Sequence, residues 1–256
     1  MKDPVRSFGA GTAQVHVFAD KRDMGAAAAR DATAIIGRAI EQRGVARLIV
    51  GTGNSQDEVI DELTRQPVDW KSVVLFHMDE YVGMPMTHPA SFRLWLKTRL
   101  ADVVGPRDAH YLAGDAADQA AECRRYADLL GEAPIDLCFI GFGENGHIAF
   151  NDPHVADFND LETVKIVEMD EKCRAQQVGE GHFPDLASMP KEAITLTCPA
   201  LFSARNLIAC VPDRRKAEAA KNAIEGPLDT RCPASMVMTH ANATVYLDRE
   251  SASLLQ

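Results

Sequence analysis

Several features that would place this 256-residue chain in a specialised class of protein are missing from it. Its six cysteines form no Cys-x-x-Cys pair and its eight histidines form no His-Glu-x-x-His pattern, so the spacing predicts reduced, free thiols and indicates no metal. No apolar run approaches the roughly 20 residues that span a membrane. The first residues lack the apolar core of a signal peptide. We therefore expect a cytoplasmic protein without a membrane partner.

An excess of basic residues is also missing. The net charge is −10, with 27 lysines and arginines against 37 aspartates and glutamates, and no basic stripe offsets it. This balance argues against a nucleic-acid partner, because phosphate backbones would be repelled. A small phosphorylated ligand remains compatible, since it needs only N–H groups and one or two cations. No Gly-Lys-Ser/Thr follows a glycine-rich turn, which disfavours ATP.

Short apolar runs alternate with helical patterns along the chain. The predicted strands are 46–50, 73–76, 135–140, 193–197, 207–211 and 244–247, and the predicted helices are 23–42, 56–65, 91–100, 116–130 and 213–225. This alternation predicts βαβ units in an α/β fold: a mostly parallel central sheet with helices on both faces, in a single domain over residues 1–256. The least regular stretch, 151–190, is either an ordinary connection or a lid over a site.

A glycine-rich turn, Gly51-Thr-Gly-Asn-Ser55, separates the first predicted strand from the next helix. Small residues let the backbone approach an anion, and a helix N-terminus offers free N–H groups. Ser55 and Glu58 have the spacing of a capping box, which places the start of the helix at Gln56. Such turns are also glycine-rich for conformational reasons alone, so the pattern favours neither interpretation by itself.

Two adjacent carboxylates, Asp79 and Glu80, follow the apolar run that ends at Phe76. Neighbouring residues at a strand end point in different directions, so only one of them needs to face a site. A partly desolvated carboxylate has a raised proton affinity and can act as a general base. The alternative is a carboxylate that caps a turn.

The richest stretch is 135–153, where an apolar strand is followed by glycines, by His147 and then by Asp152. Strand ends of parallel sheets are where open α/β folds bind ligands. A histidine exchanges protons near neutral pH, and a carboxylate partner fixes its tautomer.

The run Arg214-Arg-Lys216 adds cations near a helix start, which suggests an anion site or, for some of the three, a solvated charge run.

Two motifs together carry a family resemblance: Met78-Asp-Glu-Tyr-Val-Gly83 with His88-Pro89 and Ser91, and Gly143-Glu-Asn-Gly-His-Ile-Ala-Phe-Asn-Asp-Pro153. They resemble the glucosamine-6-phosphate deaminase (isomerase) family, within the group of sugar-phosphate isomerases and 6-phosphogluconolactonases. The resemblance runs over about residues 25–248. It implies a modified Rossmann-like, three-layer fold and the conversion of a hexosamine 6-phosphate to a ketose phosphate and ammonia, without a cofactor.

The resemblance also implies catalytic roles. Asp79 would move a proton between C2 and C1 of the opened sugar. His147 would open the sugar ring, Asp152 would hold and polarise His147, and Asn145 would orient it. A sugar phosphate is thus the implied partner, and many family members are homo-oligomers.

For the phosphate, the resemblance points to Thr52, Gly53, Asn54 and Ser55 in the turn and to Lys216. The family commonly has Thr-Gly-Gly-Thr-Pro at that turn, and this chain lacks the second glycine and the proline.

Two further departures bear on the substrate. The acid at position 152 is commonly a glutamate in the family, one methylene longer than Asp152. The segment 176–183 contains no arginine where a substrate-binding arginine is usual, although Arg174 lies nearby. Another amino-sugar or hexose phosphate, a lactonase reaction, and a non-catalytic sugar-phosphate sensor are the alternatives that the sequence leaves open.

Overall fold

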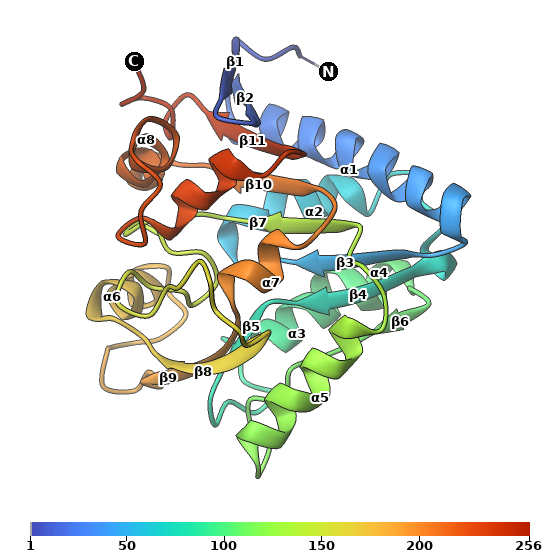
Figure 1. Cartoon of the computed structure of the whole chain (residues 1–256), viewed down its shortest axis with the longest axis vertical. Helices are drawn as coiled ribbons and strands as arrows, with labels where there is room; N and C mark the ends of the chain where they lie inside the picture. Colours follow the sequence, from blue (N-terminus) through green and yellow to red (C-terminus); the bar gives the residue numbers. More distant parts are fainter. Residues whose placement is uncertain (1) are drawn as a thin grey trace.

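The computed structural model describes residues 2–256, in which one large and one small β-sheet are surrounded by helices (Figure 1). The eight strands of the large sheet lie in the order β1 (Arg6–Ala10), β2 (Ala13–Phe18), β11 (Ala243–Asp248), β10 (Leu207–Val211), β7 (Leu137–Ile140), β3 (Ala46–Val50), β4 (Val73–His77) and β6 (Asp108–Ala109). Every neighbouring pair is parallel except β1 and β2, which form an antiparallel hairpin. The predicted α/β fold with a mostly parallel central sheet is confirmed.

Helices cover both faces of this sheet. They are α1 (Lys21–Arg43), α2 (Asp57–Leu63), α3 (Phe92–Leu96), α4 (Asp102–Val104), α5 (Gln119–Gly131), α6 (Glu171–Gly179), α7 (Cys198–Phe202) and α8 (Ala217–Glu225). In strand β3, Leu48 packs into the core formed with α1 and α2, whereas Ile49 packs into the core formed with α5, α7 and α8. Burial on both faces explains why β3 reads as an uninterrupted apolar run.

The longest helix, α1, has clear signals at both ends. Asp20 is its N-cap, and the carboxylate of Asp20 accepts the backbone N–H of Asp23 at 2.9 Å. Gly44 ends the helix in the left-handed conformation, with φ of 74°, and donates its N–H to the carbonyl of Ile40. The predicted helix 23–42 therefore extends by two residues at its start and one at its end.

A second, three-stranded antiparallel sheet was not predicted. It consists of β5 (Asp79–Tyr81), β9 (Glu192–Leu196) and β8 (Val164–Glu168). The strand predicted at 193–197 thus belongs to this sheet and not to the central one. The stretch 151–190 is also more regular than predicted, because it holds β8 and α6. The N-terminal hairpin β1–β2 likewise went unpredicted.

Two predicted helices are interrupted. The helix expected over 91–100 is α3 followed by a π-helical turn, Lys97–Ala101, and by α4. The helix expected over 213–225 begins as a 3₁₀ turn, Arg214–Lys216, and becomes α8 only at Ala217. The strands predicted at 46–50 and 207–211 match β3 and β10 residue for residue.

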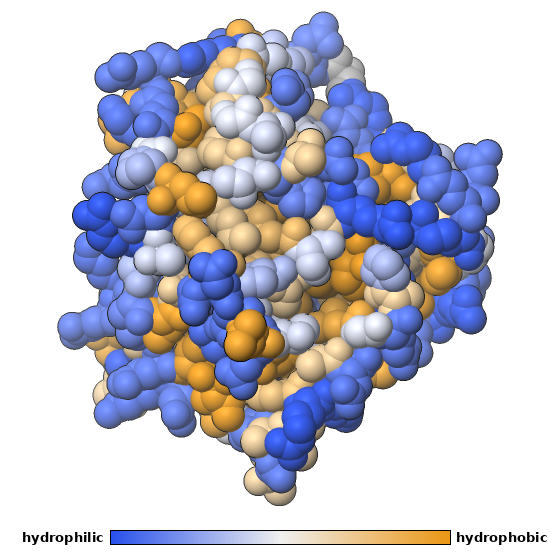
Figure 2. Space-filling view, viewed as in Figure 1, coloured by the Kyte–Doolittle hydropathy of each residue, from blue (hydrophilic) through white to orange (hydrophobic). Residues whose placement is uncertain are grey.

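The parallel strands β3, β4 and β7 point their carboxyl ends toward α6 and the small sheet, on the left of Figure 1. On the face shown in Figure 2, hydrophobic residues gather toward the middle and hydrophilic residues form the rim. Among residues 2–256, no helix combines the length and the apolar character needed to cross a membrane.

Candidate active site

A cavity opens where the carboxyl ends of the central strands meet α6. Its wall is made by the turns that follow β3, β4, β7 and β10, together with the C-terminal end of α6. Segments far apart in the sequence are thus brought to one place by the sheet topology, as is usual for open α/β folds.

The turn after β3 contributes four of the five residues predicted to hold phosphate: Thr52, Gly53, Asn54 and Ser55 line the cavity. The predicted capping box is wrong. A 3₁₀ turn, Asn54–Gln56, precedes α2, so Ser55 caps no helix, and Glu58 instead pairs with Lys21 at 2.9 Å. The hydroxyl oxygen of Ser55 accepts from the side-chain amide of Gln56 at 3.1 Å.

Two glycines after β7 let the backbone come close to neighbouring side chains. A Cβ on Gly141 would lie 2.5 Å from the Ser55 Oγ atom, and one on Gly143 would lie 2.2 Å from the imidazole of His147. Both distances are shorter than any real Cβ contact. The glycines of this stretch are therefore required by close packing around the cavity.

The 3₁₀ turn after β10 brings two cations to the cavity, Arg215 and Lys216, while Arg214 is exposed and away from it. Lys216 is only 5% exposed. Burial lowers the pKa of Lys216, and the charge of Glu180 opposes that shift. Asp213 begins the turn with φ of 77°, a conformation that costs a non-glycine residue about 1–3 kcal/mol.

Both cations face one carboxylate, that of Glu180 just after α6. Its Oε1 atom lies 3.1 Å from Arg215 Nη2 and 3.9 Å from Lys216 Nζ. Burial raises the pKa of Glu180, but the neighbouring ring of His182 and the charges of Lys216 and Arg215 outweigh burial and leave the pKa below its ordinary value. Glu180 is therefore ionised at neutral pH and offsets part of the positive charge of the two cations.

Asp79, in β5, faces the cavity, and the adjacent Glu80 points away from it. The Glu80 carboxylate accepts the hydroxyl of Ser91 at 2.6 Å and the backbone N–H of Arg93 at 3.0 Å. Asp79 is 6% exposed, and its Oδ1 atom has no hydrogen-bond partner among residues 2–256. Burial, assisted by the charge of Glu80, raises the pKa of Asp79 well above its ordinary value.

His77, at the end of β4, fixes the backbone next to Asp79. Its ring donates from Nδ1 to the Asp79 carbonyl at 2.9 Å, and Nε2 accepts the N–H of Leu112 at 2.9 Å. Burial lowers the pKa of His77 to about 3, so the ring is neutral. This histidine is a structural support for β5 and does not reach the cavity.

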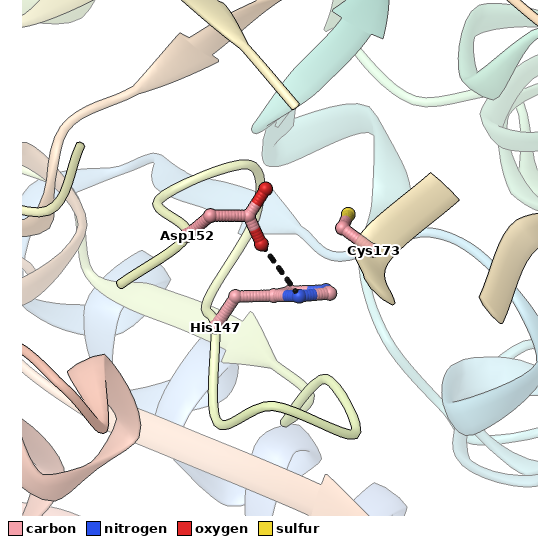
Figure 3. A group of neighbouring side chains, drawn as sticks. All are labelled: His147, Asp152 and Cys173. Atoms are coloured by element: carbon pink, nitrogen blue, oxygen red, sulfur yellow. Dashed lines mark ion pairs between the residues drawn. The ribbon is translucent and has the colours of Figure 1, made fainter. Parts of the chain in front are cut away.

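His147 lies on the cavity wall, and the Asp152 carboxylate points toward its ring (Figure 3). The Asp152 Oδ1 atom is 3.1 Å from His147 Nδ1, so the shorter acid at position 152 does reach the ring. The oxygen lies off the hydrogen-bonding direction of Nδ1, which has no aligned partner among the described residues. The two side chains are therefore close enough for an ion pair but do not form an aligned hydrogen bond.

A set of donors holds the Asp152 carboxylate in place. Asn145 donates from its amide to Asp152 Oδ1 at 3.0 Å, and the Asp170 backbone N–H donates to Oδ2 at 3.0 Å. Burial raises the pKa of Asp152, but His147 and these donors outweigh it and lower the pKa. Asn145 also accepts the backbone N–H of His147 at 3.1 Å, so it lies between the two residues and not on the cavity wall.

The segment at and after α6 contributes residues that sequence reasoning did not single out: Gln176, Gln177, Glu180 and His182 line the cavity. Arg174 does not replace the missing arginine, because its guanidinium donates to the carbonyls of Leu186 and Met189. Arg215 supplies a guanidinium to the cavity from a different segment. The sequence does point to this segment, because 176–183 lacks the arginine that the family usually has there. Its pattern does not predict the helix α6 that brings these side chains to the cavity.

Comparisons with known proteins agree with this architecture. Residues 19–246 match the family described as glucosamine-6-phosphate isomerases/6-phosphogluconolactonase. Glucosamine-6-phosphate deaminases from Listeria monocytogenes serotype 4a and from Exiguobacterium sibiricum are each 34% identical to the chain. The first aligns over 90% of the chain and 96% of the relative, and the second over 80% of each.

Solved structures give the same result. A monomeric glucosamine-6-phosphate deaminase superposes with a TM-score of 0.84 at 28% identity, covering 94% of this chain and 99% of that one. A putatively assigned 6-phosphogluconolactonase from Neisseria gonorrhoeae superposes with a TM-score of 0.72 at 17% identity, covering 91% and 98%, which shows the shared fold alone. The chain belongs to the glucosamine-6-phosphate isomerase/6-phosphogluconolactonase family, a family of enzymes.

Proposed function

We propose that the protein converts a hexosamine 6-phosphate, with glucosamine 6-phosphate as the leading candidate, and water into a ketose 6-phosphate and ammonia. The observation that carries this proposal is the meeting of a buried, unpaired carboxylate, a histidine–carboxylate pair and two cations in one cavity. The relatives named glucosamine-6-phosphate deaminase support the choice of amino sugar.

Asp79 suits the transfer of a proton between adjacent carbons. Such a transfer needs one base that reaches both C2 and C1, and a carboxylate with raised proton affinity takes up a carbon-bound proton more readily than an ordinary one. Its unpaired Oδ1 atom leaves the base free for the substrate. After the C2 proton moves to C1, the nitrogen at C2 is an imine, which water hydrolyses to the ketone and ammonia.

His147 suits the preceding step, the opening of the sugar ring. The ring oxygen must gain a proton and the C1 hydroxyl must lose one, and an imidazole performs both transfers near neutral pH. Asp152, at 3.1 Å from His147 Nδ1, stabilises the charged ring, and Asn145 holds that carboxylate in position. We assign the phosphate to the turn Thr52–Ser55 together with Lys216 and Arg215, where binding remote from the reacting carbons provides positioning.

The purified protein should release one ammonia per ketose 6-phosphate when glucosamine 6-phosphate is added. In heavy water the product should carry solvent deuterium at C1, because the carboxylate exchanges its proton with solvent during part of the turnovers. Hydrolysis of 6-phosphogluconolactone without ammonia release would overturn the proposal in favour of a lactonase. Tight binding of sugar phosphates without turnover of either compound would indicate a sensor.

A further inference from the structure

The side chains of His147, Asp152 and Cys173 form a compact cluster (Figure 3), of which His147 lines the cavity. They come from the turn after β7, the loop that follows, and the first turn of α6. One ligand atom from each, namely a ring nitrogen, a carboxylate oxygen and the thiol sulfur, lies within 4.8 Å of the other two. All three residues are buried.

This combination of atoms is a ligand set for zinc. Thiolate, imidazole and carboxylate each bind Zn²⁺ at about 2.0–2.3 Å, and sites with three protein ligands keep a fourth position for water. Ligand atoms at those bond lengths lie roughly 3–4 Å apart. A small contraction of the cluster, with His147 and Asp152 already 3.1 Å apart, would complete the site.

Two further observations point to a ligand at this place. The Nδ1 atom of His147 is buried in a residue that is 7% exposed, and it has no hydrogen-bond partner among residues 2–256. The Asp152 carboxylate is held by the Asn145 amide and the Asp170 N–H, which are the kind of outer contacts that orient metal ligands. An entry path exists because His147 itself lines the cavity.

We propose that His147, Asp152 and Cys173 form an inhibitory site for a thiol-binding divalent cation, with Zn²⁺ preferred. On binding, the Cys173 thiol loses its proton to solvent and a metal–sulfur bond forms, without any change in oxidation state. The metal occupies His147 Nδ1, the atom that faces Asp152, and fixes the imidazole away from its proton-transfer cycle. The inhibitory consequence rests on the ring-opening role proposed for His147, whereas the binding site itself does not.

Binding is tested first, independently of activity. The metal-free protein is titrated with Co²⁺, which gives a near-ultraviolet charge-transfer band only when a thiolate binds it. We expect one equivalent of Co²⁺ to produce the band and Zn²⁺ to displace it. The band should be lost in Cys173→Ala and kept in Cys232→Ala, which alters a thiol on a different segment that is not among the three ligands. Absence of the band in the wild type, or its persistence in Cys173→Ala, would overturn the proposal.

Inhibition is tested with the same variants. Zn²⁺ should inhibit the wild type and Cys232→Ala at the concentration at which it displaces Co²⁺, and chelation should restore turnover. Cys173→Ala should need at least about 100-fold more Zn²⁺. If Cys173→Ala does not fold, Cys173→Ser replaces it. Stoichiometric binding without inhibition would reject the inhibitory role, while a protein that binds metal but releases no ammonia at all would reject the proposed function and leave the site intact.

Discussion

Two groups of charged residues at the cavity differ in whether their charged atoms have partners within the protein. The acidic group consists of Asp79, His147 and Asp152. Within it, one carboxylate oxygen of Asp79 has no hydrogen-bond partner among the described residues, and the pKa of Asp79 is raised. The cationic group, Lys216 and Arg215, is partly neutralised by the carboxylate of Glu180. Asp79 and Lys216 are both buried, so the contrast between these two residues does not come from solvent access, whereas Arg215 is exposed. Under the proposed function, Asp79 acts as a base because it lacks a hydrogen-bond partner, and a phosphate would compete with Glu180 for Arg215 and Lys216.

The largest expected effect tests the acidic group. Replacing Asp79 with asparagine keeps the shape and removes the base, so kcat should fall by about 10²–10⁴-fold while the KM for the sugar phosphate changes little. Ammonia release and deuterium incorporation at C1 should fall together. The matched control is Asp128→Asn, on the exposed surface of α5, which should turn over like the wild type. Equal turnover in Asp79→Asn would show that another residue is the base.

The next effect tests the cationic group. Lys216→Met removes a buried cation, and the loss of a charge-assisted contact to phosphate costs about 1.5–3 kcal/mol, or roughly 10–100-fold in kcat/KM. Most of this loss should appear in KM, because the phosphate is held alike before and during the reaction. Lys221→Met, in the helix α8 that follows Lys216 and outside the cavity lining, is the control. A loss confined to kcat would place Lys216 among the proton-transfer residues instead.

Glu180 gives a smaller and more diagnostic effect. Glu180→Gln keeps a hydrogen-bonding side chain but removes the charge that neutralises Arg215 and Lys216. Inorganic phosphate should then bind up to about fivefold more tightly, in line with about 1 kcal/mol for a partly screened ion pair. The binding constant is measurable by calorimetry and as competitive inhibition. Weaker phosphate binding in this variant would mean that Glu180 chiefly orients the cations.

The sequence predicted the acidic group better than its surroundings. His147 and Asp152 are five residues apart, so one turn suffices to bring them together, and β3 and β10 were predictable because burial on both faces gives continuous apolar runs. Glu180 and Lys216 meet only because α6 packs across the strand ends, and Cys173 approaches His147 for the same reason. These contacts depend on a segment whose helix is short and weakly patterned. The wrong prediction of a capping box at Ser55 has a similar cause. The same residues are compatible with a 3₁₀ turn, and the sequence alone does not distinguish the two structures.

The smallest expected effect is on thermal stability. Its dependence on pH tests directly whether Asp79, unlike the cations, lacks a partner. The pKa of Asp79 is raised in the folded state above the unfolded value of about 3.9. Its contribution to stability is therefore fully present below that value and is lost as the pH rises through the raised pKa, because the buried carboxylate must then ionise. Asp79→Asn removes this cost, so it should raise Tm at pH 8 by about 2–4 °C, equivalent to about 1 kcal/mol, and by much less at pH 4. Thermal unfolding of Asp128→Asn should show no such pH dependence. A Tm difference for Asp79→Asn that is equal at both pH values would mean that Asp79 is already neutralised by a partner, and the contrast between the two groups would not hold.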